Sequence, residues 1–368
     1  MVTAAVVEQQ AAQFELTQIE LDDLRPDEVR VRIHASGMCH TDLSVRDGHT
    51  PAPLPAVLGH EGAGEVEEVG ASVTTVAVGD RVVLSFDCCG ACLPCRTGHT
   101  VQCVHWMQLN FFGGARLDGS PTMHAADGGV LHGHFFGQSS FATHVVCSER
   151  SVVKIDSDAD WTTLAPLGCG IQTGAGSILN VLRPWPGSTV AIYGAGAVGL
   201  AGVLAAQLTP AAQVIVVDRV AERLALAEEI GATATVEAGR EPVVESILEL
   251  TGGRGADVVL EATGNTGVLR NAVDALAVGG RCGVVGAPPV GSEVALDVTQ
   301  MLIRNPCIIG INQGLSVPQE LIPALVALHD RGRFALDRLI TDFPFEAIND
   351  AAAAALDGTA VKPVLVMN

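Results

Sequence analysis

The chain has 368 residues, of which 48% are hydrophobic, so it is long enough to form two domains with cores of their own. Its 41 Asp and Glu against 21 Lys and Arg give a formal net charge of −20, which repels phosphate backbones and argues against nucleic acid as a partner. No apolar stretch reaches the length of a membrane span, and the start MVTAAVVEQQ lacks the basic region of a secretion signal, so we expect a cytoplasmic protein without membrane contacts.

Short runs of β-forming residues, separated by Gly and Pro, occupy the first 150 residues. They lie at 28–33, 64–69, 81–84 and 141–146. This spacing predicts an antiparallel, barrel-like β domain whose loops carry function. Residues 113–137 contain many Gly and His and show little periodicity, which predicts a long loop.

Four cysteines in this region are closely grouped, at Cys89, Cys92, Cys95 and Cys103. Thiolates at this spacing can close around one tetrahedral zinc ion. Because four sulfurs fill the coordination shell, we expect a structural site that stabilises a lobe over 86–105 and takes no part in chemistry. The chain has ten cysteines and no secretion signal, and their grouping favours metal binding over a disulfide framework.

From about residue 186 the pattern changes to alternating strands and helices. The apolar runs that predict strands lie at 189–193, 213–218, 257–261, 281–285 and 308–311. The segments that predict helices lie between the first two strands to about residue 209, at 219–230, near 243–250, at 318–329 and at 346–356. This alternation predicts a doubly wound parallel sheet, that is, an α/β fold.

A dinucleotide-binding fingerprint, Gly194-Ala-Gly196-Ala-Val-Gly199, follows the first of these strands and opens a helix. The first glycine permits a tight turn, the second lets the backbone approach a pyrophosphate, and the third lets the helix pack closely on the strand. Asp218 ends the next strand, where its carboxylate can bind both ribose hydroxyls and repel a 2′-phosphate, so NAD is favoured over NADP. Arg219 beside it keeps NADP as one alternative, and a glycine-rich turn that binds no nucleotide is another.

Three further residues with the chemistry of zinc ligands are scattered along the chain. Cys39 lies in GMCHTD, His60 in GHEG and Cys169 in GCG, each close to glycine. Together they are the ligand types of an open, catalytic zinc site with three protein ligands. Spacing alone does not bring them together, and each by itself is more often a packed cysteine or a hydrogen-bonded histidine.

Several local sequence motifs favour a zinc-ligand role for these three residues. GMCHTD, GHEGAGEVEEVG, CGACLPC and GCGIQTGAGS occur in this order ahead of YGAGAVG, and with them the chain resembles the zinc-containing medium-chain alcohol dehydrogenases over essentially its whole length. The run FFGQSSFATH at 135–144 is similar to the bacterial aryl- or benzyl-alcohol dehydrogenases. The resemblance implies a GroES-like β-barrel catalytic domain at 1–169 and 310–368 and a Rossmann NAD-binding domain at 170–309.

The resemblance also implies roles around the metal. The catalytic zinc ligands would be Cys39, His60 and Cys169, with the fourth position open to water or substrate. Asp42 would orient His60, and Glu61 would lie behind the metal. Thr41 would pass the substrate proton outward. Ser44 stands where many members have the histidine that ends this proton relay, so the last step would run through ribose and water.

Further residues match positions that contact the coenzyme. The residues implied at its pyrophosphate, adenosine ribose and nicotinamide, beyond the fingerprint itself, are His40, Lys362, Arg223, Thr173, Val198 and the backbone of Val285. The expected cofactors are therefore NAD and two zinc ions per chain, one catalytic and one structural.

These observations predict a zinc- and NAD-dependent alcohol dehydrogenase that interconverts primary alcohols and aldehydes by hydride transfer. Only 14 aromatic residues predict a mostly aliphatic pocket with a few rings, such as Phe86 and the residues near 111–112, suited to benzylic, allylic or terpenoid alcohols. Family likeness implies a homodimer or homotetramer, paired through the edge strand at 308–311.

Two other functions stay open. A thiol-dependent formaldehyde dehydrogenase of the same superfamily would need a cationic mouth, for which 105–145 offers few residues besides Arg116. A zinc- and nucleotide-binding sensor without catalysis would need only the structural metal. A third metal at His132 and His134 is a weaker hypothesis, because no further ligand lies nearby in the sequence.

Overall fold

The computed structural model describes residues 2–367, and the chain forms two compact units. The first unit comprises Met1–Cys169, Val317–Gly332 and Asp337–Asn368, and the second comprises Gly170–Ser316 and Arg333–Leu336. Residues 310–316, which we expected in the first domain, lie with the second unit. Ser316 shows this attachment, since its one hydroxyl hydrogen lies between the Gln172 side-chain oxygen and the Gln313 carbonyl, both within that unit.

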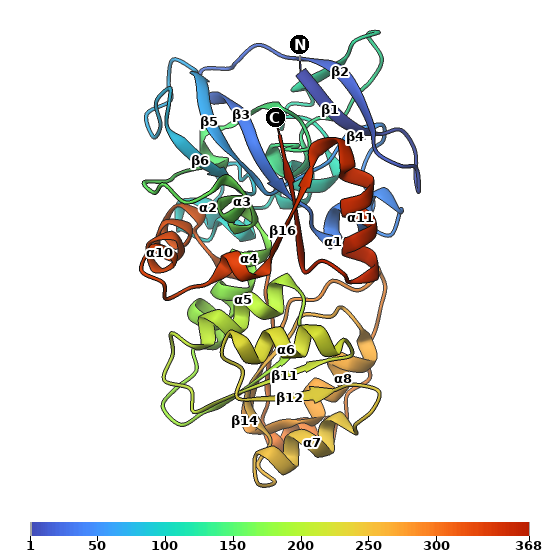
Figure 1. The fold of residues 1–368 in the computed structure, drawn as a ribbon, viewed down its shortest axis with the longest axis vertical. Helices are drawn as coiled ribbons and strands as arrows, with labels where there is room; N and C mark the ends of the chain where they lie inside the picture. Colours follow the sequence, from blue (N-terminus) through green and yellow to red (C-terminus); the bar gives the residue numbers. More distant parts are fainter. Residues whose placement is uncertain (1, 368) are drawn as a thin grey trace. The chain divides into compact units, whose positions relative to one another are not determined.

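Two sheets form the first unit (Figure 1). Its strands are β1 (Val2–Val7), β2 (Glu15–Leu21), β3 (Glu28–Gly37), β4 (Ala56–Val57), β5 (Gly62–Val69), β6 (Arg81–Leu84), β7 (Met123–Ala125), β8 (His144–Ser148), β9 (Val152–Lys154), β16 (Ile340–Pro344) and β17 (Lys362–Val366). Its helices are α1 (His40–Arg46), α2 (Leu93–Arg96), α3 (Trp161–Leu164), α10 (Pro318–Asp330) and α11 (Ile348–Asp357). The strand order is β4-β1-β2-β7 in one sheet and β16-β17-β3-β5-β6-β9 in the other, where β8 also pairs with β3.

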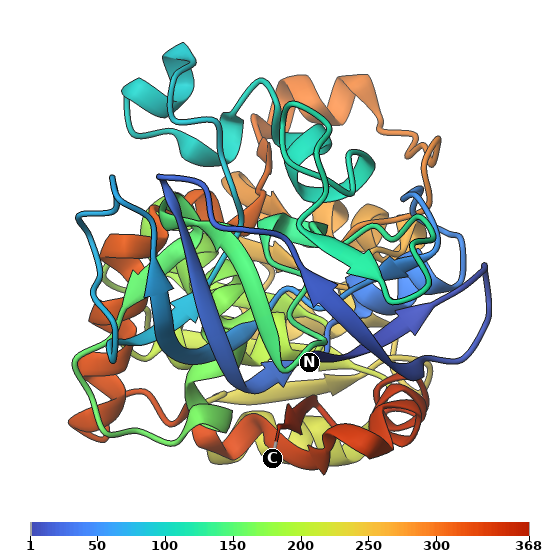
Figure 2. The same ribbon diagram turned by 90° about the horizontal axis from the view of Figure 1, so that it is seen from above.

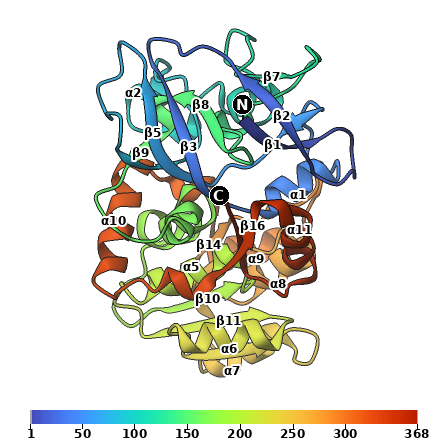
Figure 3. The same ribbon diagram turned by 45° about the horizontal axis from the view of Figure 1, so that its top comes forward.

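Strand β3 is the centre of the larger sheet. It pairs antiparallel with β5, β8 and β17, and Figure 3 shows β3, β5 and β8 side by side. Val29, Val31 and Ile33 alternate along it and are buried, as expected for a strand with one face on a core. The predicted strands at 28–33, 64–69 and 81–84 are confirmed as β3, β5 and β6. The unit is not purely antiparallel, because β16 and β17 run parallel.

The stretch 113–137 is less irregular than predicted, because it contains β7, which pairs with β2. Arg116 anchors it from within. Its guanidinium donates to both oxygens of Glu28, at 2.6 and 2.8 Å, and to Asp22 at 2.5 Å. It also donates to the carbonyl oxygens of Pro121 and Asp23. The Arg116 guanidinium is therefore fully hydrogen-bonded to groups of its own unit.

The second unit is built on one six-stranded parallel sheet. Its strands are β10 (Thr189–Tyr193), β11 (Gln213–Asp218), β12 (Ala234–Glu237), β13 (Ala256–Glu261), β14 (Leu276–Val284) and β15 (Cys307–Gly310). Its helices are α4 (Gly170–Gly176), α5 (Ala197–Ala206), α6 (Ala221–Glu229), α7 (Val243–Leu250), α8 (Thr266–Asp274) and α9 (Val298–Arg304). The order β12-β11-β10-β13-β14-β15 reverses direction beside β10, which is the strand order of dinucleotide-binding folds.

The predicted doubly wound sheet is therefore confirmed, and β10, β11 and α7 begin and end where the sequence pattern places them. Alternate residues of β10 face opposite helical layers. Tyr193 packs in a cluster with Ile247 of α7 and Val273 of α8, whereas Ile192 faces Gly202 of α5. Helix α5 is buried along most of its length because α4 covers the side that the sheet does not. None of the helices in 2–367 combines the length and apolar character needed to cross a bilayer.

We predict that Arg116→Met lowers the free energy of unfolding by about 3–5 kcal/mol, because it leaves the Glu28 carboxylate buried without its partner. Urea denaturation measures this. Arg25→Met is the matched control, since the Arg25 and Asp118 side chains are 37% and 57% exposed and their ion pair is screened by water, so its midpoint should hardly move. Equal midpoints for the two variants would contradict the anchoring role.

Candidate active site

Side chains with metal-ligand chemistry converge in the first unit from segments far apart in the sequence. Cys39 directly precedes α1, His60 lies between β4 and β5, and Cys169 follows the 3₁₀ turn Ala165–Gly168. One ligand atom from each of these three residues, and one from Glu61, lie within 4.8 Å of one another. His60 and Glu61 are fully buried, and Cys169 is nearly so. The fold thus brings together the residues that the sequence scatters.

Glycines allow this close approach. Gly59, directly before His60, has φ +87°, and a Cβ there would lie 2.4 Å from the backbone nitrogen of Phe141. A Cβ on Gly168 would lie 2.2 Å from the carbonyl oxygen of Leu84. A larger residue at either position would displace a ligand segment.

Asp42 holds two of the ligand segments at once. Its Oδ1 accepts hydrogen bonds from His60 Nδ1–H at 2.9 Å and from the Gly59 N–H at 3.0 Å, and its Oδ2 accepts one from the Cys39 N–H at 2.9 Å. With the hydrogen on Nδ1, the lone pair of His60 is on Nε2. Within 2–367 that atom is buried and has no hydrogen-bond partner. A buried imidazole nitrogen with a free lone pair beside cysteine sulfurs fits a metal ligand.

The charges around the site also favour a cation. The hydrogen bond with Cys169, and then the neighbouring His60 and Lys362, hold the pKa of Cys39 well below that of an ordinary thiol, although burial opposes this. Burial disfavours a charged imidazole, yet the Asp42 carboxylate outweighs burial and raises the pKa of His60 to about 10. Surroundings that stabilise a thiolate and attract a proton to the neighbouring ring also stabilise a divalent cation.

Aromatic rings surround His60. Its ring stacks on Phe136 with centroids 4.4 Å apart and meets Phe135 edge-on at 5.4 Å. The ring centroid of Phe111 lies 4.9 Å from that of Phe136 and 5.7 Å from that of Phe135. The centroid of Trp106 lies 6.4 Å from that of Phe136. Several of the chain's few aromatic residues, Phe111 among them, therefore lie around His60.

The four grouped cysteines form a second candidate metal site. Their Sγ atoms lie within 4.8 Å of one another, with Cys92 and Cys95 3.4 Å apart and Cys89 and Cys95 4.0 Å apart. Zinc–sulfur bonds of about 2.3 Å at tetrahedral angles place sulfurs about 3.8 Å apart, so the cluster has the size of such a site. The N–H groups of Cys89 and His105 donate to Cys103 Sγ at 3.3 and 3.4 Å. All four cysteines are free of disulfides.

Little else stabilises this lobe, which projects from the sheets of its unit in Figure 2. Its buried cluster consists of Cys88, Cys103 and Leu109, with the other cysteines and Trp106 packed against it. Leu93 and other apolar side chains of the lobe face solvent. A lobe whose core is mostly sulfur depends on what bridges the sulfurs.

The glycine-rich turn of the second unit has the geometry of a dinucleotide site. Gly194 has φ +97°, and α5 begins after Gly196. A Cβ on Gly199 would lie 1.7 Å from the Gly194 carbonyl oxygen, whereas a Cβ on Gly196 would meet no atom within 4 Å. The third glycine is therefore required by helix–strand packing, and the second leaves room for a pyrophosphate at the helix N-terminus.

Asp218 lies beside this turn at the end of β11. Its Oδ2 accepts a hydrogen bond from the Ala195 N–H at 2.6 Å, and its Oδ1 accepts one from the Val220 N–H at 2.9 Å. The residue is partly exposed, so each oxygen keeps acceptor capacity for a ribose hydroxyl. Arg219, which follows it, is exposed, and Arg223 lies on α6.

The remaining predicted coenzyme residues occupy both units. In the second unit, α4 crosses α5 so closely that a Cβ on Gly174 would lie 2.0 Å from the Val198 carbonyl oxygen, which makes Thr173 and Val198 neighbours. Val285 follows β14, and its N–H donates to the carbonyl of Glu261 at 2.9 Å. In the first unit, His40 is exposed at the start of α1.

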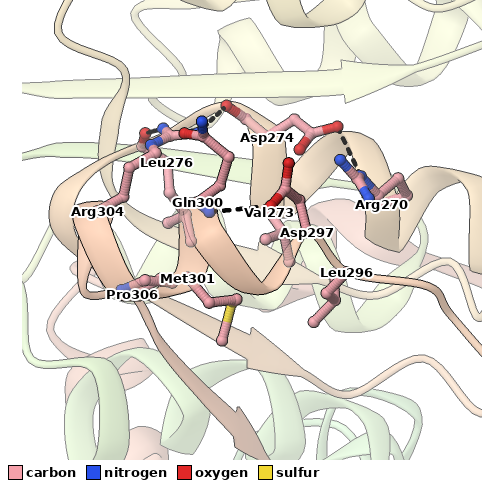
Figure 4. A pocket seen from close by; sticks show the side chains of 10 residues that line it. All are labelled: Arg270, Val273, Asp274, Leu276, Leu296, Asp297, Gln300, Met301, Arg304 and Pro306. Carbon is pink, nitrogen blue, oxygen red and sulfur yellow. Dashed lines mark hydrogen bonds and ion pairs between the residues drawn. The ribbon is translucent and has the colours of Figure 1, made fainter.

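A pocket between α8 and α9 contains none of the predicted site residues (Figure 4). Arg270 forms an ion pair with Asp274 at 2.8 Å. Arg304 donates to the carbonyl oxygens of Asp274 and Leu276. Because both guanidinium groups bind the protein itself, this pocket is the junction of two helices.

Comparisons with known proteins show the family of the chain. Residues 25–157 match the family model of the alcohol dehydrogenase GroES-like domain, and residues 197–330 match that of the zinc-binding dehydrogenases. A geraniol dehydrogenase from Castellaniella defragrans is 42% identical over 363 residues, which cover 99% of this chain and 97% of that protein. The chain belongs to the zinc-containing medium-chain alcohol dehydrogenase family.

Solved structures of this family show the same fold. A Burkholderia ambifaria protein described as an alcohol dehydrogenase zinc-binding domain protein is 48% identical with a TM-score of 0.97, and the match covers 100% of this chain and 99% of that one. Benzyl alcohol dehydrogenase from Acinetobacter calcoaceticus is 42% identical with a TM-score of 0.96, again over 100% and 99% of the two chains. The expected GroES-like domain and Rossmann domain are thereby confirmed.

Lys362, which we predicted at the pyrophosphate, forms its described hydrogen bonds inside the first unit. Its Nζ donates to both carboxylate oxygens of Glu61 at 2.9 Å and to the carbonyl of Met38 at 3.1 Å, and these bonds use its three hydrogens. Burial opposes a charged lysine, but Glu61 outweighs it and raises the pKa of Lys362. Lys362 therefore neutralises Glu61 behind the metal-ligand cluster.

Thr41 and Ser44, which we predicted at the start and the end of a proton relay, lie on α1. Cys39 Sγ and Thr41 Oγ1 lie 3.6 Å apart, so the Thr41 hydroxyl borders the ligand cluster. Ser44 Oγ and Thr50 Oγ1 form a hydrogen bond of 2.9 Å in which either can donate. Ser44 is therefore part of a pair of hydrogen-bonded hydroxyls.

The hypothesis of a third metal finds no support among residues 2–367. Only the two groups described above bring three or more His, Cys, Asp or Glu side chains within ligand distance of one another. His134 is buried, with its Nε2 3.8 Å from Asp87 Oδ2.

We predict that Cys95→Ser lowers both the zinc content and the melting temperature of the protein, because three sulfurs no longer close the shell that holds the lobe. Elemental analysis and calorimetry measure the two effects. Cys147→Ser, which changes a buried cysteine outside both clusters, should keep the zinc content of the wild type. Unchanged zinc content and melting temperature in Cys95→Ser would count against a structural metal.

Proposed function

We propose that the chain is a zinc- and NAD-dependent alcohol dehydrogenase that interconverts primary alcohols and aldehydes. The observation that carries this proposal is the convergence of Cys39, His60 and Cys169, with His60 Nε2 buried and unpartnered, in a chain that also has a dinucleotide turn. Names of relatives support the substrate type, since one acts on geraniol and another on benzyl alcohol.

The three residues would hold the catalytic zinc, and the four-cysteine lobe would hold a structural one. When bound, zinc supplies Lewis-acid chemistry that favours loss of the alcohol proton, and NAD accepts the hydride. Asp42 keeps the His60 proton on Nδ1, so that Nε2 faces the cation as a lone pair. Lys362 cancels the charge of Glu61, which would otherwise add a third anion beside two thiolates.

Thr41 is the first residue we assign to proton transfer. Its Oγ1 borders Cys39 Sγ, so a hydroxyl that can both accept and donate stands beside the reacting centre. Beyond it, the Ser44–Thr50 hydroxyl pair can pass a proton in either direction, in the place of the usual histidine.

The rings around His60 support a substrate with an aromatic or conjugated carbon skeleton. Phe135 and Phe136 contact His60 and Phe111 and Trp106 pack against them, so a substrate bound beside His60 would lie close to aromatic rings, which pack well on other π-systems. Benzylic, allylic and terpenoid primary alcohols fit this surface better than polyols, which need many hydrogen-bonding groups.

NAD is the proposed coenzyme. The Asp218 carboxylate would bind the ribose hydroxyls and repel a 2′-phosphate. Arg219 lies in the short loop between β11 and α6 and belongs to neither element. His40 is proposed at the pyrophosphate, Arg223 at the adenosine ribose, and Thr173, Val198 and Val285 at the nicotinamide.

The thiol-dependent formaldehyde dehydrogenase is disfavoured by Arg116. This cation, the main one in 105–145, is 5% exposed and binds Glu28, Asp22 and backbone carbonyls, so it offers no charge to an anionic thiol adduct. The non-catalytic sensor is disfavoured by the intact three-ligand cluster.

We also propose a homodimer formed through β15. This strand is the last in its sheet, and an edge strand is a template for pairing with a second copy. Next to it in sequence, α9 exposes Val298, Leu302 and Ile303 by 81%, 80% and 65%, an apolar surface typical of protein contacts.

We predict that the wild type oxidises benzyl alcohol and geraniol with NAD at a far higher kcat/KM than with NADP, and oxidises glycerol poorly. Cys39→Ser should bind NAD and remain folded, yet lose activity, because one metal ligand is weakened. Steady-state kinetics across this panel and NAD titration measure both. Near-wild-type turnover by Cys39→Ser would exclude the proposed site, and formaldehyde oxidation that requires an added low-molecular-weight thiol would favour the rival enzyme.

We predict a dimeric mass by light scattering, shifted toward the monomer in Leu302→Glu because a charge would enter the apolar contact. Val78→Glu, at a side chain 62% exposed in the first unit, is the matched control and should leave the mass unchanged. A monomeric wild type would contradict the dimer.

A further inference from the structure

We propose that Gln138 is a positioning residue for the catalytic metal site, which it serves by fixing the backbone that carries His60 and Cys169. The proposal rests on the proposed function, because it concerns the metal of that site. Gln138 belongs to the segment 135–141, which contains no metal-ligand side chain of its own within either cluster.

Gln138 is fully buried, and its side-chain amide connects two backbone segments of the site, one at 60–62 and one at Ser85. Its Nε2 donates to the carbonyl oxygens of His60 and Ser85, each at 3.1 Å, and its Oε1 accepts from the Gly62 N–H at 3.1 Å. Both side-chain hydrogens and one acceptor position are therefore used on backbone groups. The backbone on each side of Glu61 is held by one side chain.

The second link runs through Ser85 to Cys169. The carbonyl of Ser85 accepts from Gln138, and its hydroxyl donates to the carbonyl of Gly168 at 2.8 Å. Gly168 directly precedes Cys169. A single amide thus connects the position of His60 with that of Cys169, which lie on segments more than a hundred residues apart in the sequence.

The backbone of 135–141 is strained in order to present this side chain. Phe136 and Ser139 both have φ +51°, a region that non-glycine residues rarely occupy, and Gly137 between them has φ +70°. Ser139 stabilises the bend, since its hydroxyl donates to the Val57 carbonyl at 2.6 Å and accepts from the Phe135 N–H at 2.8 Å. Such strain persists only where surrounding contacts impose it, and it concentrates at functional sites.

The same segment contacts the site on other sides. The Ser140 N–H donates to the carbonyl of Gly59, and its hydroxyl hydrogen-bonds Ser36 at 2.9 Å. The ring of Phe136 stacks on His60. Removing the Gln138 amide would take one hydrogen bond from the His60 carbonyl, one from the Ser85 carbonyl and one from the Gly62 N–H, so the ligand backbone would relax away from its metal-binding geometry.

The test compares zinc release from the wild type, Gln138→Met and Thr122→Val. Methionine keeps the length of glutamine but none of its hydrogen bonds. Thr122 is the matched control, because it is fully buried in the same unit and its hydroxyl donates to the Gly133 carbonyl at 2.6 Å, away from every ligand segment. Release is followed with a coloured chelator, and the geometry of the catalytic site is read from the visible absorption of the Co²⁺-substituted proteins.

We expect Gln138→Met to release the catalytic zinc about 10- to 100-fold faster than the wild type, the range found for residues that support metal ligands. Its Co²⁺ absorption bands should shift, its structural zinc should be released at the wild-type rate, and Thr122→Val should match the wild type in all three. If Gln138→Met does not fold, Ser85→Ala takes its place. It breaks only the second link, from the Ser85 hydroxyl to the Gly168 carbonyl, and should accelerate release of the catalytic zinc to a smaller extent.

Wild-type release rates and Co²⁺ bands in Gln138→Met, or in Ser85→Ala as its replacement, would overturn the positioning role alone. A wild type that holds zinc only in the four-cysteine lobe would overturn the proposed function and the positioning role with it. Zinc content of the wild type, measured first, separates these two failures.

Discussion

The buried carboxylate of Asp42 is the contact on which the active site depends. It binds the Cys39 N–H, the Gly59 N–H and the His60 ring, so it fixes two ligand segments and the tautomer of one ligand together. Without it, the His60 lone pair would have no fixed direction, and the two cysteine sulfurs alone would not define a three-ligand metal site. The glycines beside the ligands serve the same end, because they let the segments approach to the distances that a metal requires.

Two buried carboxylates with different partners lie beside the ligands. Asp42 places a negative charge against His60, whereas Lys362 places a positive charge against Glu61. The second pair keeps the interior from becoming too negative for the thiolates, and the first keeps it negative enough to hold a cation. The electrostatics of the site therefore come from side chains contributed by β17 and α1, at opposite ends of the chain.

What the sequence predicted well is local. The four cysteines and the glycine turn lie within short segments whose spacing already contains the geometry, and the parallel strands read directly from apolar runs. What it missed is long-range. The sequence around Lys362 does not indicate its contact with Glu61, which lies 301 positions away. The sequence around Gln138 likewise does not indicate its contact with His60, which lies 78 positions away. The strained backbone at Phe136 leaves no periodic signal either, so the stacking of Phe136 on His60 emerged only from the fold.

The central claim is that Cys39, His60 and Cys169 hold one zinc ion with its fourth position open to substrate. Anomalous diffraction from crystals of the purified protein, recorded on both sides of the zinc absorption edge, tests it most directly. The account predicts two peaks per chain, one within the four cysteines and one bonded to Cys39 Sγ, His60 Nε2 and Cys169 Sγ. A map with a peak only in the four-cysteine lobe, or with Glu61 as a permanent fourth ligand in every state, would contradict it.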